Sequence, residues 1–333
     1  MMKAVSRLGI TCYEHLMITR LLTKDGRVAG AFGLHRESGA YFVFKAKATM
    51  LGAGGMTNLL SRTSAYHPAT GDSFALAYEA GAELFNMEFI GYSLIPTPLG
   101  ISIPLGGTLP MTAGGARFYN AIGERIMEKY DSEKLELCAE WKMPYANYKE
   151  RKEGLGPVYI DLSYMQKPYK GLIDKVKLAT GIDALKERVE MSVSTRTSPG
   201  GVWINEKGRT TVPGLYAAGD ASGESGIRGA GGRAGGFTNA HVFGQRAGKY
   251  AAEEALNSSL LEPEKEQVSR ESVRMEMFKK NKGRSPYDVE RKLREFSYEN
   301  LNIIRDRQGI ERAIRYFAEL GCNVAPKVSA SNL

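Results

Sequence analysis

Cysteine and histidine are scarce in this sequence, which limits the kinds of site that it can form. The 333 residues include four histidines and three cysteines, Cys12, Cys138 and Cys322, which lie far apart in the chain. An odd number of distant cysteines indicates neither a disulfide framework nor a Cys-x-x-Cys metal motif. We therefore predict no metal site, and we predict a reducing compartment, the cytoplasm.

Long apolar runs and blocks of one charge are also missing. No run approaches the roughly 18 to 20 apolar residues that cross a bilayer, so we expect no membrane span. The first residues lack the apolar core of a secretory signal. The net charge of +8 is spread along the chain without the basic face or motif of a nucleic-acid-binding protein, so we expect no nucleic-acid partner. A positive net charge suits a small anionic ligand.

Glycine, in contrast, is abundant, and it clusters at the ends of predicted strands. The chain holds 38 glycines, and a usual share would be about 7%. Residues 16–22, 28–35 and 41–45 are rich in β-branched and aromatic side chains and are separated by turn sequences, which predicts an antiparallel three-stranded meander. A further strand over 47–51 continues into Gly-Ala-Gly-Gly at 52–55, where a backbone or a cofactor can approach without meeting a Cβ.

The rest of the chain predicts one helix near this strand, an α+β insertion and a helical tail. Thr70-Gly-Asp opens a helix that extends to about residue 83, with Thr70 or Asp72 able to cap it. Beyond Pro263 apolar residues recur at helical spacing to the end of the chain. The elements expected in the insertion are helices over 132–152 and 166–179 and a strand over 158–162.

Residues 200–256 carry the strongest indication of a ligand site. A strand over 212–218 ends in Gly219 and Asp220, a loop with seven glycines follows, and a long helix begins near Phe237. A helix N-terminus presents unpaired N–H groups and about half a positive charge, and Asp220 can accept hydrogen bonds from hydroxyl groups. The pattern indicates an anionic or polyhydroxyl ligand. The alternative is a tight strand-to-helix crossover without a ligand, which leaves the entropic cost of the glycines unexplained.

A dinucleotide-binding fingerprint is not part of this pattern. Residues 229–234 fit Gly-x-Gly-x-x-Ala formally, but they do not directly follow a strand. The acidic residue that should end a second strand about twenty residues later is also missing. We therefore reject a Rossmann fingerprint in this sequence.

Seven motifs follow one another in a single collinear order along nearly the whole chain. They are Met-Leu-Gly-Ala-Gly-Gly at 50–55, Thr-Gly-Asp-Ser at 70–73, Asn-Met-Glu-Phe at 86–89, Asn-Ala-Ile-Gly-Glu-Arg-Ile-Met at 120–127, Gly-Pro-Val-Tyr-Ile-Asp at 156–161, Val-Pro-Gly-Leu-Tyr-Ala-Ala-Gly-Asp at 212–220 and Gly-Ala-Gly-Gly-Arg-Ala-Gly-Gly at 229–236. Together they resemble the succinate dehydrogenase/fumarate reductase flavoprotein family. The resemblance implies an FAD-dependent oxidoreductase.

The same resemblance implies the fold class and the order of the domains. The fold is α+β, with an α/β FAD-binding core fragment that carries the meander, an inserted α+β capping domain and a C-terminal helical segment. The family's N-terminal Gly-x-Gly-x-x-Gly unit, which holds the FAD adenosine and pyrophosphate, has no counterpart in this sequence. The implied domains are a partial FAD-binding domain at 1–95, a capping domain at 96–193, the isoalloxazine side of the FAD-binding domain at 194–260 and a shortened C-terminal helical domain at 261–333.

Individual residues also receive roles from the resemblance. The family's arginine that binds a substrate carboxylate matches Arg233, one of its histidines falls at Arg196, and its Thr-Glu pair becomes Thr112 followed by alanine. The expected catalytic residues are therefore Arg233, Arg196 and Thr112, together with His67, which is chosen for its own position, followed by proline and just before the Thr-Gly-Asp helix. The expected cofactor-binding residues are Gly54, Gly55, Thr70, Gly71, Asp72, Gly219, Asp220, Gly235, Gly236, Phe237, Thr238 and Asn239.

Three functions stay open from the sequence. The first is hydride transfer at flavin N5 with an anionic substrate, where the dipole of the helix near Phe237 would stabilise negative charge by roughly 0.3–2 kcal/mol. The second is an adenylylsulfate-reductase-like flavoprotein, in which a sulfur nucleophile adds at N5. The third is a fragment or split subunit, inactive without a partner that supplies the ADP-binding half. The expected partners are a small anionic substrate and an iron–sulfur electron-transfer subunit or a chain with the missing domain, in the cytoplasm or peripheral to the inner membrane.

Overall fold

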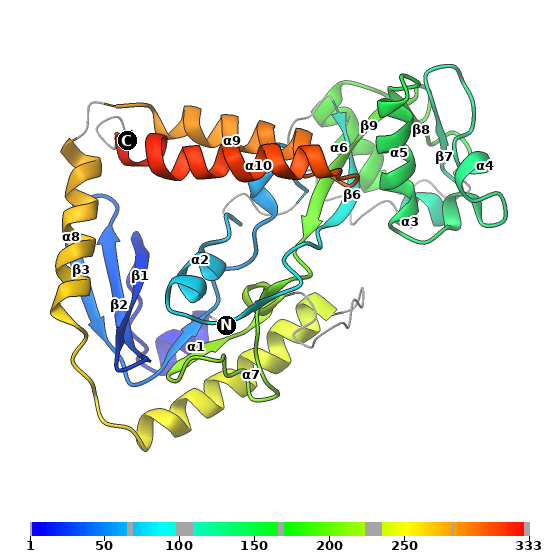
Figure 1. The fold of residues 1–333 in the computed structure, drawn as a ribbon. Helices are drawn as coiled ribbons and strands as arrows, with labels where there is room; N and C mark the ends of the chain where they lie inside the picture. Colours follow the sequence, from blue (N-terminus) through cyan, green and yellow to red (C-terminus); the bar gives the residue numbers. More distant parts are fainter. Residues whose placement is uncertain are drawn as a thin grey trace.

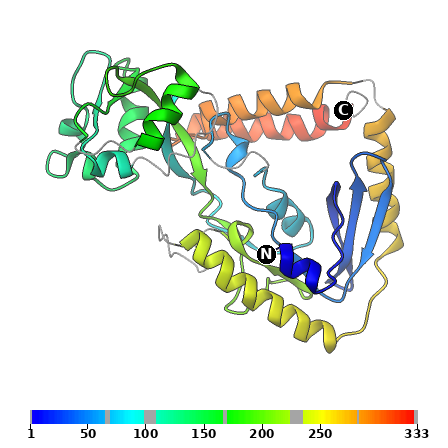
Figure 2. The same cartoon turned by 180° about the vertical axis from the view of Figure 1, so that it is seen from behind.

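The computed structural model describes residues 2–64, 69–97, 109–165, 170–223, 235–280 and 283–329. The chain forms an open frame, with the meander at one end and a smaller lobe projecting at the other (Figures 1 and 2). A pair of C-terminal helices runs along one side of the frame, and the long helix that follows the glycine-rich loop runs along the opposite side (Figure 1). The α+β fold class is confirmed.

The meander forms as predicted and is covered on both faces. Its strands are β1 (Leu16–Lys24), β2 (Arg27–His35) and β3 (Tyr41–Lys45), which pair antiparallel in that order. Asp25 and Gly26 both take positive φ at the β1–β2 turn, which matches the twist of a two-residue hairpin. Leu22 and Phe32 are fully buried against Met275 of α8 (Lys265–Lys280), while the opposite face joins the central core.

The central core is built on a short parallel pair of strands. These are β4 (Thr49–Leu51) and β11 (Leu215–Ala217), with Leu51 opposite Ala217. Helices α2 (Asp72–Glu79) and α7 (Gly235–Leu256) supply side chains to the same core. Ala247 of α7 is fully buried in this core, whereas its neighbour Gly248 is exposed.

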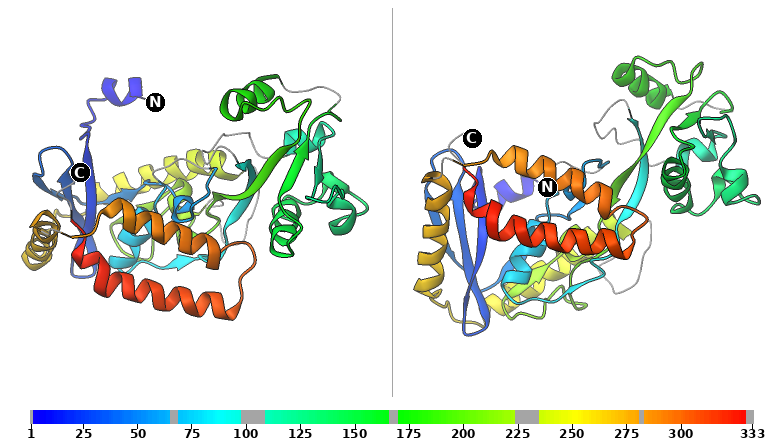
Figure 3. Two further views of the ribbon diagram at one scale, coloured as in Figure 1. Left: turned by 90° about the horizontal axis from the view of Figure 1, so that it is seen from above. Right: turned by 45° about the horizontal axis from the view of Figure 1, so that its top comes forward.

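The projecting lobe is an antiparallel sheet with its own apolar core. Its strand order is β6 (Gly91–Pro96), β9 (Val189–Thr197), β8 (Val158–Asp161) and β7 (Arg117–Tyr119). Its helices are α3 (Leu109–Ala113), α4 (Met127–Tyr130), α5 (Lys142–Lys152) and α6 (Lys170–Thr180). Phe118, Ile160 and Met191 are buried in this core, and β6 and β9 lead from the lobe to the rest of the chain (Figure 3).

The C-terminal helices connect the lobe with the central core. α9 (Pro286–Asn300) and α10 (Arg307–Glu319) lie side by side in Figures 1 and 3, and the rings of Phe296 and Tyr316 stack with their centroids 4.0 Å apart. The Tyr298 hydroxyl of α9 donates to the carbonyl oxygen of Val193 in β9 at 2.9 Å. α9 also contacts the short 3-10 helix η1 (Thr57–Leu59), which follows the glycines at 52–55.

Some local predictions differ from the structure. The stretch predicted as one helix over 132–152 is a 3-10 turn, η3 (Leu135–Leu137), followed by α5, because Leu135 takes a positive φ of 48° that a continuous helix does not allow. Residues before the meander include a helix, α1 (Met2–Arg7), that the sequence analysis did not predict. The short strands β5 (Leu84–Phe85) and β10 (Gly201–Val202) pair antiparallel. The predicted domain boundaries stay a prediction.

Candidate functional site

The two glycine motifs meet at one edge of the parallel pair. Because β4 and β11 are parallel, residues 52–55 and 218–220 leave the sheet on the same side. A Cβ on Gly55 would lie 2.9 Å from the Ser198 Oγ and 3.7 Å from the Asp220 Cβ. We call this region, made of residues 52–55, 198 and 219–223, the glycine edge.

Hydrogen bonds hold the first of these loops in one position. The Met56 N–H donates to the Ser198 Oγ at 3.0 Å, and the Ala53 N–H donates to the Ser73 Oγ at 3.1 Å. The N–H of Gly71, just before α2, donates to the Gly55 carbonyl oxygen at 2.9 Å. The loop is therefore anchored to two other segments, so its backbone is organised before any ligand arrives.

Among the described residues, the outer side of the glycine edge is open. An added Cβ on Gly52 or Gly54 would meet no described atom within 4 Å, and Gly54 has a positive φ of 83° that favours glycine. Gly55, by contrast, is buried and closely packed. A ligand could thus approach the backbone at Gly52 and Gly54 but not at Gly55, where the absent side chain makes room for Ser198.

Asp220 is the acidic group of the glycine edge. Its side chain is exposed and makes no hydrogen bond or ion pair within the described part of the chain. Desolvation by the protein around it nevertheless raises the pKa of its carboxyl above the usual value. Hydroxyl donors from a ligand would stabilise its ionised form. This is the chemistry expected from the sequence for a polyhydroxyl group.

The N-terminus of α7 lies next to the second glycine motif. The Asn239 amide donates to the Gly223 carbonyl oxygen at 3.2 Å, and an added Cβ on Gly219 would lie 3.5 Å from the Ala240 Cβ. Phe237 is 81% exposed, with its ring centroid 4.2 Å from that of His241. Of the predicted cofactor residues, Gly235, Gly236, Phe237, Thr238 and Asn239 therefore form the first turns of the helix beside Gly219 and Asp220.

The start of α2 is only partly as predicted. Neither Thr70 nor Asp72 caps the helix, because Gly71 occupies the cap position in the left-handed conformation and no side chain bonds to the free N–H groups. Thr70 instead donates to the Asp72 carboxylate at 2.5 Å. Asp72 also lines an apolar cavity that faces β1. Gly71 is thus joined to the glycine edge, whereas the Asp72 side chain faces another part of the molecule.

The predicted catalytic residues are divided between two places. Arg196, near the end of β9, forms an ion pair with Glu140 at 2.5 Å and is 40% exposed. Thr112 is buried in α3, and α3 packs against η3. The 3-10 helix η3 ends three residues before Glu140 in the chain. Both residues therefore adjoin the same part of the lobe. Arg233 and His67 lie outside the described residues.

Sequence reasoning missed Asn58 and Ser198. Asn58 is 1% exposed, and neither its amide nitrogen nor its amide oxygen has a hydrogen-bond partner among the described residues. Buried amides are normally hydrogen-bonded, so this group would be stabilised by a polar partner or by water. Ser198 is 4% exposed and bonds the glycine edge. No motif marks either residue in the sequence.

Other kinds of site find no support in the described ranges. They contain no group of three His, Cys, Asp or Glu side chains placed to bind a metal ion. Cys12, Cys138 and Cys322 are all free thiols. None of the described helices combines the length and the apolar character needed to span a membrane.

The chain is similar in sequence to known flavin-binding proteins. A family described as an FAD binding domain matches residues 1–237. An uncharacterized FAD-dependent oxidoreductase of Methanocaldococcus jannaschii is 33% identical over 327 residues, which cover 95% of this chain and 59% of that protein. One subunit of the fumarate reductase (CoM/CoB) of Methanothermobacter marburgensis is 32% identical over 334 residues, again with 95% and 59% coverage. The chain thus spans about three fifths of these relatives.

Solved structures share the fold. Mycobacterium smegmatis Sdh1 in complex with UQ1 matches with a TM-score of 0.83 and 26% identity, over 98% of this chain and 57% of that chain. Adenylylsulfate reductase of Archaeoglobus fulgidus matches with a TM-score of 0.72 and 20% identity, over 95% and 61%. The second likeness shows the fold alone.

Proposed function

Because the chain belongs to the FAD binding domain family, we propose that its glycine edge and the start of α7 bind the isoalloxazine side of FAD in an oxidoreductase. Bound FAD would supply hydride transfer at N5 with a small anionic substrate. The observation that carries this proposal is the parallel pairing of β4 with β11, which brings residues 52–55 and Asp220 to one open edge.

The residues present fit such a cofactor. Gly52 and Gly54 leave open space in front of the backbone, and Asp220 offers an acceptor for hydroxyl groups. The first turns of α7 bring unpaired N–H groups and a partial positive charge to the same place. The glycines here have no side chain, so their role would be to let the backbone bind and orient the ring, while Asp220 would accept hydrogen bonds from hydroxyl groups of the cofactor.

Flavin binding is expected to weaken in Gly52→Ala without loss of stability. The added methyl group would enter the open space of the glycine edge, where it meets no described atom but would meet the cofactor. We expect the Kd for FAD to rise about tenfold, which corresponds to about 1.4 kcal/mol. Asp220→Asn is expected to have an effect of similar size, because it removes the charged acceptor. Titration of flavin fluorescence measures both.

The matched control is Gly248→Ala. It adds the same methyl group at an exposed position of α7 with no described atom within 4 Å. Its Kd for FAD should equal that of the unchanged protein. If Gly52→Ala and Asp220→Asn bind FAD as tightly as this control, the glycine edge is not the flavin site.

For the anionic substrate, we propose that Arg196 binds a carboxylate after exchanging its partner Glu140. The ion pair at 2.5 Å holds the guanidinium in place, and its 40% exposure leaves it accessible. A guanidinium fork matches a carboxylate in shape and charge. In Arg196→Gln the Kd for succinate or fumarate, measured by perturbation of the flavin absorbance, should rise about tenfold.

Arg188→Gln provides a charge-matched control for this variant. Arg188 lies just before β9, pairs with Asp161 at 3.1 Å and is similarly exposed. Its loss should leave anion binding within about twofold of the unchanged protein. An equal loss of binding in both variants would show that only the net charge of the lobe matters, and would remove Arg196 from the substrate site.

A partner is also part of the proposal. Among the described residues, β4 pairs with β11 on one edge and with no strand on its other edge. In a parallel strand the N–H and C=O groups of one residue point to one edge, and those of the next residue point to the other. The N–H and C=O of Met50 therefore face an open edge, and its side chain is 41% exposed. A strand from another segment or chain could pair there and complete the FAD site. One relative is named as one subunit of a fumarate reductase, which supports a partner subunit, and we propose that this partner transfers electrons through an iron–sulfur centre.

The adenylylsulfate-reductase-like alternative stays a prediction, since the likeness to that enzyme extends to the fold only. Location in the cytoplasm, or at the periphery of the inner membrane, likewise stays a prediction.

A further inference from the structure

Two neighbouring cavities lie along β1 and are lined by residues of this strand, α2 and α8. β1 is the edge strand of the three-stranded sheet, and both α2 and α8 contact it. The first cavity has a volume of about 330 Å³ and the second about 410 Å³. Glu79 and Arg274 line both of them, so the cavities adjoin.

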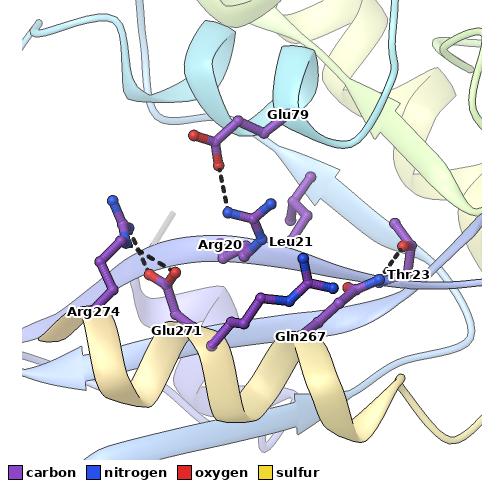
Figure 4. Close-up of a pocket in the computed structure, with 8 residues that line it drawn as sticks. Arg20, Leu21, Thr23, Glu79, Gln267, Glu271 and Arg274 are labelled. Atoms are coloured by element: carbon purple, nitrogen blue, oxygen red, sulfur yellow. Dashed lines mark hydrogen bonds and ion pairs between the residues drawn. The ribbon is translucent and has the colours of Figure 1, made fainter. Parts of the chain in front are cut away.

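The first cavity is lined by arginines from two distant parts of the sequence. Arg20 of β1 pairs with Glu79 of α2 at 3.2 Å. On α8, Arg274 makes two hydrogen bonds to the buried Glu271, at 3.0 and 2.6 Å. Figure 4 shows both pairs, Arg20 with Glu79 and Arg274 with Glu271. Arg270 is the third arginine of the lining.

Arg270 has no ion pair or hydrogen bond with any residue in the described ranges. Three arginines thus face two glutamates, which leaves one positive charge uncompensated in the first cavity. The nearby amide of Gln267 is neutral and so does not compensate this charge, and it is already engaged with the backbone N–H and the hydroxyl of Thr23, at 2.9 and 2.8 Å (Figure 4). An added oxyanion would fit the unpaired guanidinium in charge and in hydrogen-bonding shape.

The second cavity is apolar. Its walls are formed chiefly by aliphatic and aromatic side chains, which include Ile18, Leu34, Leu76, Met275 and Phe278. The charged groups on these walls have partners of their own. Lys279 pairs with Glu276 at 3.0 Å, and Asp72 accepts a hydrogen bond from Thr70.

We propose that the two cavities together bind a small amphiphilic anion, with its carboxylate or phosphate head at Arg270 and its apolar body against α2 and α8. Volumes of about 330 and 410 Å³ are within the usual range of about 300–1,000 Å³ for small-molecule sites. The lining of these two cavities contains neither Arg196 nor any residue of the glycine edge. Asp72 is the one lining residue that the sequence assigned to the cofactor, so this site is additional to the flavin site.

The test is isothermal titration calorimetry of the 333-residue chain with octanoate and with octyl phosphate. At least one of them should bind with a Kd below about 1 mM, and the better of the two identifies the head group. Octanol, which lacks the charge, and butyrate, which lacks most of the apolar body, should each bind at least about tenfold more weakly. Absence of binding by both anions, or equal binding of octanol, would overturn the proposal.

Variants at each end of the site locate the ligand. Arg270→Gln should weaken binding about tenfold, whereas Lys265→Gln, an exposed position on the same helix that lines neither cavity, should change it little. Ala75→Trp places a large ring in the apolar cavity from an exposed position of α2 and should abolish binding, while Ala318→Trp on the exposed surface of α10 should not. Equal effects within either pair would overturn the proposal. Because these titrations need no flavin, their failure is separate from failure of the proposed oxidoreductase function.

Discussion

Gly201→Ala is expected to lower the free energy of unfolding by about 3 kcal/mol. A Cβ at this buried position in β10 would lie 2.3 Å from the backbone nitrogen of Gly223 and 2.9 Å from the carbonyl oxygen of Ala221. Both atoms belong to the backbone of the glycine edge, so no side chain can rotate to make room. The segment would have to separate from β10. Urea denaturation followed by circular dichroism measures the change.

Gly52→Ala serves as the control for this stability prediction. It introduces the same substitution on the same edge, but the new Cβ meets no described atom within 4 Å and the φ of Gly52 is not positive. Its free energy of unfolding should stay within about 1 kcal/mol of the unchanged protein or rise slightly, because alanine restricts the unfolded chain. Equal destabilisation of the two variants would contradict the close backbone contact at Gly201.

Glu254→Ala is expected to destabilise the protein by about 3 kcal/mol. Glu254, near the end of α7, pairs with Arg27 of β2 at 2.6 Å and accepts a hydrogen bond from the Tyr216 hydroxyl of β11 at 2.5 Å. Both members of the ion pair are largely buried, with exposed fractions of 20% for Arg27 and 14% for Glu254. Removing the carboxylate would leave a buried guanidinium without its charge partner. Denaturation at pH 7 measures the loss.

The same carboxylate predicts a pH dependence with a definite sign. Burial of Glu254 by itself raises the pKa of its carboxyl. The hydrogen bonds from Tyr216 and Arg27, together with the charges of Arg209 and Arg27, lower that pKa by more, so the net shift is downward from 4.5. Its stabilisation is therefore fully present above the unfolded-state pKa, and it is lost as the pH falls through the lower folded-state value. Between about pH 5 and 3 the unchanged protein should lose more stability than Glu254→Ala.

The neighbouring Glu253→Ala is the matched control for both measurements. Glu253 is half exposed, and its ion pair among the described residues is with Lys249, one helical turn away at 3.9 Å. Such exposed pairs contribute about 0.3–0.5 kcal/mol, and no strong pH dependence is expected from this one. If Glu253→Ala and Glu254→Ala lose the same stability, the buried pair does not anchor α7 to the meander and β11.

These two predictions concern the parts that keep the proposed flavin site in shape. Gly201 allows β10 to pack on the backbone between Ala221 and Gly223. Glu254 attaches the end of α7 to β2 and β11, and Asn239 attaches its beginning to Gly223. The helix N-terminus therefore keeps its position beside Asp220, which is the arrangement that electrostatic stabilisation of a reduced ring would require.

Local sequence patterns predicted most of the elements, because their signals lie within a few residues. The meander follows from β-branched and aromatic runs and from the turn at Asp25 and Gly26, whose positive φ values the turn requires. The start of α2 was placed correctly, but its cap was assigned to the wrong residue. Thr70 and Asp72 bond to each other instead, and Gly71 takes the cap position. Two polar side chains so close in sequence can either bond to each other or cap the helix, and residue preferences for the cap position do not decide between the two.

Contiguous runs of residues carry the signals for the α+β class, for the family resemblance and for the glycine motifs near residues 52–55 and 219–220, so these could be predicted. The packing of distant segments, in contrast, brought β4 and β11 together as a parallel pair, placed Ser198 in the space left by Gly55 and paired Arg196 with Glu140. It also brought Arg20, Arg270 and Arg274 around one cavity. Contacts of this kind join residues that are far apart in the chain. They depend on how whole elements pack, and no local pattern of residues carries that information.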